Sequence, residues 1–201
     1  MSEQDMMEYA VEVHQWKLSR QASYQSGDWR QVQTEVTPAM RCSLLAWLGD
    51  VTRTLDLSLE SWCLAVNYTD RFLASQLLAP DCLQLVGLTA LWVAAKQEEL
   101  LGLPPTTDQL VALCAETYTN TNFIHMELIL LAKLQFRLSA PTAAFFLAHL
   151  VAVEEGEKYW QEDLARHMVE LVLEDYKLAR LPPCKIAKAV YVAIKVRLNN
   201  K

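Results

Sequence analysis

Glycine and proline are scarce in this sequence, which has five glycines and seven prolines among 201 residues. Both residue types interrupt helices, so their scarcity favours long helices joined by short connections. No segment shows the alternation of apolar and polar residues that is typical of a half-buried strand. The sequence therefore predicts an all-α protein, and 52% hydrophobic residues are enough for a substantial core.

Excess positive charge, a leader sequence and paired cysteines are also missing. The net charge of −6 argues against non-specific binding to nucleic acid or to an anionic membrane. Residues 1–8 are polar and acidic, unlike a signal peptide. The five cysteines are scattered and include no Cys-x-x-Cys pair, as expected for reduced thiols. We expect an intracellular protein, nuclear or cytoplasmic, without nucleic-acid or membrane partners.

Motifs that carry chemistry are absent as well. The sequence has no glycine-rich phosphate-binding loop. Its histidines, at positions 14, 125, 149 and 167, have neither metal-site nor catalytic-triad spacing. The sequence thus predicts no catalytic residue, metal or cofactor, and an enzyme is the least favoured class of function.

Residues 82–97 form the stretch around which the chain is organised. No residue from Leu85 to Ala95 is charged. A helix that is apolar all round is buried on most sides, and this one is shorter than the roughly 20 residues of a membrane span. We therefore expect the central helix of a bundle, ending at Lys96.

Capping residues mark the other helices. Thr37-Pro38 and Ser58 begin two of them, Thr106 to Gln109 is a capping box, and Thr119 begins a fourth. A first helix over residues 5–18 has Tyr9, Val13 and Trp16 on one face, and it either packs on its own domain or grips a partner. The predicted helices other than the central one are 5–18, 37–55, 58–73, 106–116, 119–136 and three more after residue 140.

Four charged residues on these helices have no partner within helical reach. Arg41 and Asp70 lie on consecutive helices, and because a buried charge is costly when unpaired, we expect them to form a structural ion pair. Glu127 is surrounded by apolar neighbours, and Lys96 has only Glu99 ahead of it. Either Lys96 caps its helix and Glu127 finds a loop donor, or both await a partner protein.

Several blocks of sequence resemble the cyclin box. They occur in the family's order and spacing across residues 37–142. The matching blocks are Met40-Arg41-Cys42-Ser43-Leu44-Leu45-Ala46-Trp47-Leu48, residues 64–73, residues 83–87, Ala94-Ala95-Lys96-Gln97-Glu98-Glu99, Met126-Glu127 and Ala140-Pro141-Thr142. The first helix is similar to that of A- and B-type cyclins, while Arg41 to Leu48 and Lys96 to Glu99 are more similar to cyclins O and P.

The resemblance implies a fold and a function. It implies an N-terminal helix and linker over 1–36, a five-helix cyclin box over 37–138 and a partial second box over 139–201. A cyclin binds a cyclin-dependent kinase and activates it allosterically in cell-cycle or related control. The alternative is a cyclin-fold scaffold that binds partners without activating a kinase.

Site residues follow from the same resemblance. Lys96 and Glu127 match residues that hydrogen-bond the kinase, and Arg41 with Asp70 matches the family's internal ion pair. The other residues matched to kinase contact are Leu131, Phe136, Leu138, Tyr9, Val13 and Trp16. The residues matched to a groove that docks Arg-x-Leu motifs of substrates or inhibitors are Met40, Leu44, Trp47, Asp50, Leu83 and Gln84.

The sequence departs from the family at three of these places. Ser43 replaces an aliphatic residue of the groove, and Asp50 is one methylene shorter than the usual acid. Gln97 replaces an aromatic residue that follows the lysine in many kinase-binding cyclins. These departures put the choice of kinase and of docked peptide in doubt.

Overall fold

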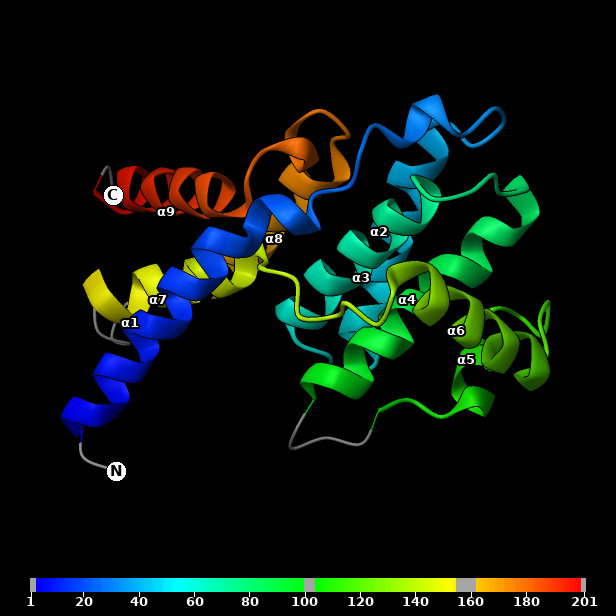
Figure 1. The fold of residues 1–201 in the computed structure, drawn as a ribbon, viewed down its shortest axis with the longest axis horizontal. Coiled ribbons are helices and arrows are strands. Elements are labelled where there is room, and N and C mark those ends of the chain that lie inside the picture. The colour runs from blue at the N-terminus through cyan, green and yellow to red at the C-terminus, as the bar shows by residue number, and fades with distance from the viewer. Residues whose placement is uncertain (1–2, 100–103, 155–161, 200–201) are drawn as a thin grey trace.

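The computed structural model describes residues 3–99, 104–154 and 162–199, and all regular secondary structure in these ranges is helical (Figure 1). The all-α prediction is confirmed. The α-helices are α1 (Glu3–Arg20), α2 (Pro38–Thr54), α3 (Leu59–Leu73), α4 (Leu83–Glu98), α5 (Thr107–Leu113), α6 (Asn120–Leu134), α7 (Ala143–Glu154), α8 (Glu162–Glu174) and α9 (Pro183–Asn199). Short 3₁₀ turns are η1 (Gln21–Tyr24), η2 (Trp29–Gln31), η3 (Pro80–Cys82) and η5 (Leu178–Arg180).

The predicted caps begin four helices of the first bundle, α2, α3, α5 and α6. The Thr37 side chain accepts a hydrogen bond from the backbone N–H of Met40, and Ser58 does the same for Ser61. Thr106 and Thr119 each form a full capping box with the residue three positions on. Each cap satisfies backbone donors that the first helical turn leaves free, which explains why these boundaries are readable from the sequence.

Helix α4 is the core of the first bundle. Every residue from Leu85 to Ala95 is buried, and the helix packs against α2, α3 and α6. Gly87 allows the contact with α2, because a Cβ atom at this position would lie 2.8 Å from both Leu44 methyl groups. The expectation of a central, enclosed helix is confirmed.

The second bundle consists of α7, α8 and α9, and α1 runs beside it (Figure 1). Helix α9 packs on α7 and α8 through Ile186, Val190 and Ile194. The first bundle contacts this unit through α3 on α7 and α2 on α8.

Polar contacts reinforce the junction between the bundles. Arg41, fully buried, donates two hydrogen bonds to the Asp70 carboxylate, Nε to Oδ1 at 2.6 Å and Nη2 to Oδ2 at 2.7 Å. Its Nη1 also donates to the carbonyls of Leu173 and Glu174 at the end of α8, at 3.0 and 3.2 Å. The two side chains therefore pair as their sequence setting suggests, and Arg41 in addition joins the two bundles.

The segment between α1 and α2 is more than the polar connection expected from its composition. It buries Tyr24, Trp29 and Val36 in the core. Asp28 accepts a hydrogen bond from the Tyr176 hydroxyl and pairs with Arg30, and hydrogen bonds from both side chains lower the pKa of Asp28. The connection is thus fixed to the second bundle.

Candidate partner-binding surfaces

Lys96 and Glu127 lie next to each other at the surface of the first bundle. Lys96 is in the last turn of α4 and Glu127 is in the middle of α6, and their side chains form an ion pair. The Lys96 ammonium also lies 3.4 Å from the centre of the Trp92 ring. The Lys96 side chain is 32% exposed and that of Glu127 is 19% exposed. The sequence left two interpretations of Lys96 and Glu127 open, and neither predicted that these two side chains contact each other.

Glu99, the acid that the sequence offers to Lys96, is used elsewhere. It accepts hydrogen bonds from the Ser58 N–H at 2.8 Å and from the Ser61 hydroxyl at 2.7 Å, at the start of α3. Lys96 therefore does not pair with Glu99 and instead forms its ion pair with Glu127 of α6.

The end of α6 presents an aromatic side chain to solvent. Gln135 and Phe136 both have left-handed backbones, with φ of 55° and 54°, a conformation that is uncommon outside glycine and asparagine. Arg71 holds this turn by donating to the carbonyls of Leu134 and Arg137, at 3.2 and 2.8 Å. Phe136 is 71% exposed as a result.

Leu131 and Leu138, also predicted to face a partner, are half-buried against the core. The hydroxyl of Tyr68 lies 2.8 Å from the Leu138 carbonyl and 3.2 Å from Oε1 of Gln97. Gln97, which replaces an aromatic residue, thus joins the end of α4 to the segment after α6. Burial is the main cause of the raised pKa of Tyr68.

Helix α1 lies beside the end of α4 and the segment after α6. Tyr9, Val13 and Trp16 line a cavity of about 620 Å³ together with Gln97 and Ser139. Tyr9 and Trp16 are 63% and 44% exposed. The structure therefore places the predicted residues of α1 across a cavity from the neighbours of Lys96 and Leu138. We call the surface formed by Tyr9, Val13, Trp16, Lys96, Glu127, Leu131, Phe136 and Leu138 the α1/α6 surface.

A pair of histidines connects α1 to α7. The rings of His14 and His149 stack with centroids 4.0 Å apart, and the rings of His14 and Phe146 are nearly perpendicular, with centroids 5.4 Å apart. The Lys17 ammonium lies 4.4 Å from the centre of the Phe145 ring. Burial and, secondarily, the proximity of His14 lower the pKa of His149 from its usual 6.5.

The lowered pKa of His149 predicts that the α1–α7 contact depends on pH. The folded state favours neutral His149. The contact should therefore contribute its full stabilisation of the fold above the usual pKa of 6.5, and this stabilisation should decrease as the pH falls below that value. We expect a histidine titration followed by NMR to give His149 a midpoint below 6.5 and His14→Ala to raise that midpoint. His125→Ala, on the distant surface of α6, is the control. An unchanged His149 midpoint in His14→Ala would contradict the contact.

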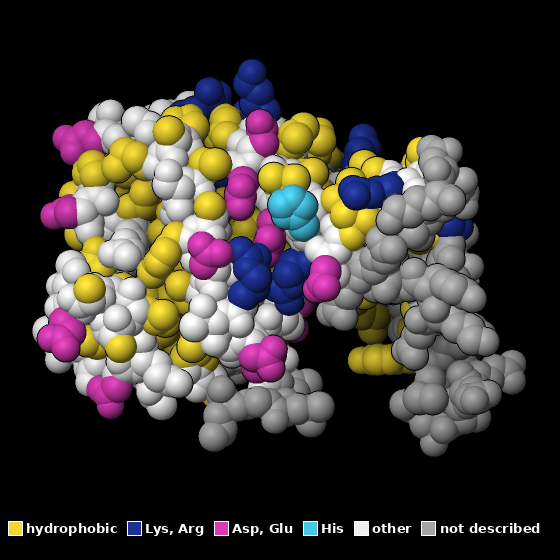
Figure 2. All heavy atoms as spheres, turned by 180° about the vertical axis from the view of Figure 1, so that it is seen from behind, with side chains coloured by type: hydrophobic (Ala, Val, Ile, Leu, Met, Phe, Trp, Pro, Cys, Tyr) yellow, Lys and Arg dark blue, Asp and Glu magenta, His cyan; other side chains and the backbone are white. Residues whose placement is uncertain are grey.

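Five of the six residues predicted to form the docking groove line a hollow between α2 and the start of α4. It has a volume of about 440 Å³, and none of its lining residues is charged. Figure 2, seen from the side opposite to Figure 1, shows hydrophobic side chains over this bundle and basic side chains with acidic neighbours beside them. The predicted residues that line the groove are Met40, Leu44, Trp47, Leu83 and Gln84, with Ser43.

Asp50, predicted to be the acid of this groove, is not among its lining residues. It lies one turn beyond Trp47 on α2, is 75% exposed, and forms an ion pair with Arg53 at 2.8 Å. Arg53 in turn contacts Glu170 of α8. Neither Arg53 nor Glu170 was singled out from the sequence, although Arg53 stands at a helical spacing from Asp50 that could have indicated the pair.

Two apolar side chains near Glu127, Ile124 and Leu128, were not predicted to belong to a partner surface. Ile124 and Leu128 are 48% and 62% exposed on α6. Their spacing of four residues places them on one helix face, a signal that the general richness of this helix in leucine obscured. They extend the apolar part of the α1/α6 surface.

No cluster of three or more metal-ligating side chains occurs among the described residues. Of the helices formed by these residues, none has the length and apolar character needed to cross a membrane. The fold and the surfaces together define an all-helical protein with two packed bundles and exposed surfaces suited to binding other proteins.

Comparisons with known proteins identify the family. The cyclin N-terminal domain profile matches residues 5–139. Human Cyclin-O is 37% identical over 92% of this chain and 54% of its own length, and mouse Cyclin-A1 is 33% identical over 98% and 46%. The viral cyclin of herpesvirus saimiri superposes with a TM-score of 0.74, at 26% identity over 82% of this chain and 72% of the viral one. The chain belongs to the cyclin family, and it spans about half the length of these curated relatives.

Proposed function

We propose that this protein is a regulatory subunit that binds a cyclin-dependent serine/threonine kinase through the α1/α6 surface and activates it. Its membership of the cyclin family and its similarity to Cyclin-O and Cyclin-A1 support this function. In this role it supplies binding energy and no catalytic group.

The observation that carries the proposal is the exposure of Phe136. An aromatic ring that is 71% exposed gains little from burial, and its left-handed backbone is a conformation that costs about 1–3 kcal/mol in a residue other than glycine. The stability of the fold therefore does not explain why a phenylalanine occupies position 136. A partner protein that covers the ring would explain it.

The surroundings of Phe136 fit a helix of the partner. Large apolar side chains are available from α1 and α6, and the Lys96–Glu127 pair provides one donor and one acceptor beside them. A kinase C-helix that docks here would be held in its inward position. That position aligns the kinase's own lysine–glutamate pair and orders its activation loop. Activation then follows from tighter binding to the active state.

The groove between α2 and α4 would serve a second purpose, the docking of substrates or inhibitors. It is apolar, and it involves helices other than α1 and α6. A kinase and a docked peptide would therefore occupy separate surfaces of the same protein.

The proposal is tested by co-expression with individual cyclin-dependent kinases, followed by purification and a kinase assay. We expect the wild-type protein to co-purify with one of them and to raise its activity. Phe136→Ser should abolish co-purification without lowering the melting temperature. Leu77→Ser is the matched control, because Leu77 is also an exposed apolar residue, at 64%, but lies in the loop after α3.

Two results would contradict the proposal. If Phe136→Ser still co-purifies with and activates the kinase, the α1/α6 surface is not the kinase site. If the complex forms but has no more activity than the kinase alone, the protein is a scaffold and not an activator.

A further inference from the structure

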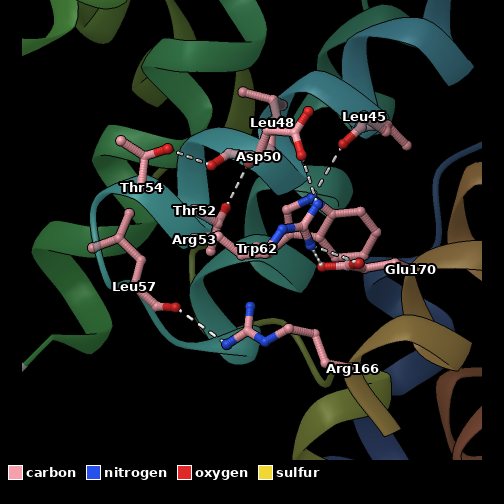
Figure 3. A network of polar contacts seen from close by, with 10 residues as sticks. All are labelled: Leu45, Leu48, Asp50, Thr52, Arg53, Thr54, Leu57, Trp62, Arg166 and Glu170. Atoms are coloured by element: carbon pink, nitrogen blue, oxygen red, sulfur yellow. Dashed lines mark hydrogen bonds and ion pairs between the residues drawn. The ribbon is translucent and has the colours of Figure 1, made fainter. Parts of the chain in front are cut away.

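Arg53 forms a bridge between the first bundle and the second (Figure 3). Its Nη2 donates to Oδ1 of Asp50 at 2.8 Å, and its Nη1 lies 2.8 and 2.9 Å from the two carboxylate oxygens of Glu170. Asp50 belongs to α2 and Glu170 to α8. One guanidinium thus contacts two carboxylates that are 120 positions apart in the sequence.

The bridge is held firmly on the side of Glu170. The Glu170 side chain is only 8% exposed, whereas those of Arg53 and Asp50 are 49% and 75% exposed. Arg53 is the ion-pair partner that the described part of the chain gives to Glu170, and a buried carboxylate that loses its cation is strongly destabilised, so the pairing opposes any turn of Arg53 into solvent.

The position of Arg53 limits the ability of Asp50 to bind a second cation. One of its carboxylate oxygens already accepts a hydrogen bond from Arg53, and the positive charge of Arg53 lies beside it. An arginine from a docked peptide would need the same carboxylate and would bring a second guanidinium next to the first. The two guanidinium groups would repel each other. The hydrogen bond between Asp50 and Arg53 would also weaken if Asp50 accepted a second hydrogen bond from the peptide arginine.

The groove itself offers no substitute for Asp50. None of its lining residues is charged, and Trp47, its residue nearest to Asp50 in sequence, is apolar. The free energy of docking would therefore come from apolar side chains that enter the hollow between α2 and α4.

We propose that Arg53 determines which peptides the groove selects: apolar segments bind, and an arginine ahead of them adds little to affinity. The inference rests on the proposed function, since it assumes that the groove docks peptides. It differs from the Arg-x-Leu preference that the resemblance implies. Arg53 acts as a specificity-determining residue, and Glu170 positions it from the second bundle.

The test compares two labelled peptides that differ only in having arginine or alanine two positions before a leucine. Their affinities are measured by fluorescence anisotropy on the wild-type protein and on Arg53→Gln, which keeps a donor for Glu170 and removes the charge. We expect a preference for the arginine peptide below about threefold in the wild type. In Arg53→Gln it should rise to about tenfold or more, the value of one charge-assisted hydrogen bond.

Arg166→Gln is the matched control, because Arg166 also reaches from α8 to the first bundle but donates to the Leu57 carbonyl at 3.2 Å (Figure 3). It should leave the ratio of affinities unchanged. Melting curves check that both variants are folded. Because Arg53→Gln leaves the buried Glu170 carboxylate without its cation, the double variant Arg53→Gln/Glu170→Gln, which removes both charges, is measured beside it and should show the same rise in preference.

A tenfold preference for arginine in the wild type that Arg53→Gln does not increase would overturn the inference. Equal affinities for both peptides in the wild type and in Arg53→Gln would overturn it as well. If neither peptide binds any of the proteins, the docking role of the groove is lost together with the inference. Co-purification of the kinase, measured in parallel, still reports on the α1/α6 surface, so the two proposals fail separately.

Discussion

Arg41→Ala is expected to lower the free energy of unfolding by about 3–5 kcal/mol, the range found when one member of a buried ion pair is removed. The substitution leaves the Asp70 carboxylate without its cation and two carbonyls of α8 without a donor. Burial opposes the charge of Arg41, but the Asp70 carboxylate outweighs it, and the pKa of the guanidinium is raised. Denaturant unfolding monitored by circular dichroism measures the loss.

The comparison for Arg41→Ala is Arg30→Ala. Arg30 also forms an ion pair with an aspartate, Asp28, but its side chain is 48% exposed. We expect this control to lose much less than Arg41→Ala, as is usual for exposed pairs. Equal losses in the two variants would mean that burial does not determine the strength of the Arg41–Asp70 contact.

Reversing the charge of Lys96 or of Glu127 is expected to weaken kinase binding about thirty-fold or more, because a charge-assisted contact across an interface is replaced by a repulsive one. The effect on folding should be small. The two side chains are partly exposed, and pairs of this kind contribute about 0–1 kcal/mol. Melting temperature and affinity for the purified kinase are the two measurements.

The double variant Lys96→Glu/Glu127→Lys separates the two roles of the pair. It restores the attraction between α4 and α6 with the charges exchanged, so the melting temperature should return toward that of the wild type. Affinity for the kinase should not return, since the kinase would meet each charge at the wrong place. Recovery of binding in the double variant would show that the pair only connects α4 to α6.

How much the sequence predicts depends on the range of the interaction. The boundaries of α2, α3, α5 and α6 were predictable because Thr37, Ser58, Thr106 and Thr119 act on backbone groups within three residues. The Arg41–Asp70 pair was predictable because neither residue has a local partner. The same reasoning would pair Lys96 with Glu127, but the two interpretations left open by the sequence were a helix cap with a loop donor and a contact with a partner protein.

Contacts between distant segments could not be predicted. Nothing near Arg53 in the sequence points to Glu170, and nothing near His14 points to His149. Trp29 is one of two aromatic residues in a polar segment, and only the packing of that segment on the second bundle explains its burial. The pairing of Asp50 with Arg53 is linked to one of these distant contacts, the one between Arg53 and Glu170, so the position of Asp50 outside the lining of the groove could not be predicted.

The fixed connection between α1 and α2 bears on the entropy of association. Ordering the backbone of one residue costs about 1–2 kcal/mol, so a loose tether of this length would impose a large penalty on any partner that had to immobilise it. Here Trp29, Asp28 and Tyr176 hold the tether in the free protein. That ordering is complete before a partner arrives, and the attachment point of α1 is preorganised for binding.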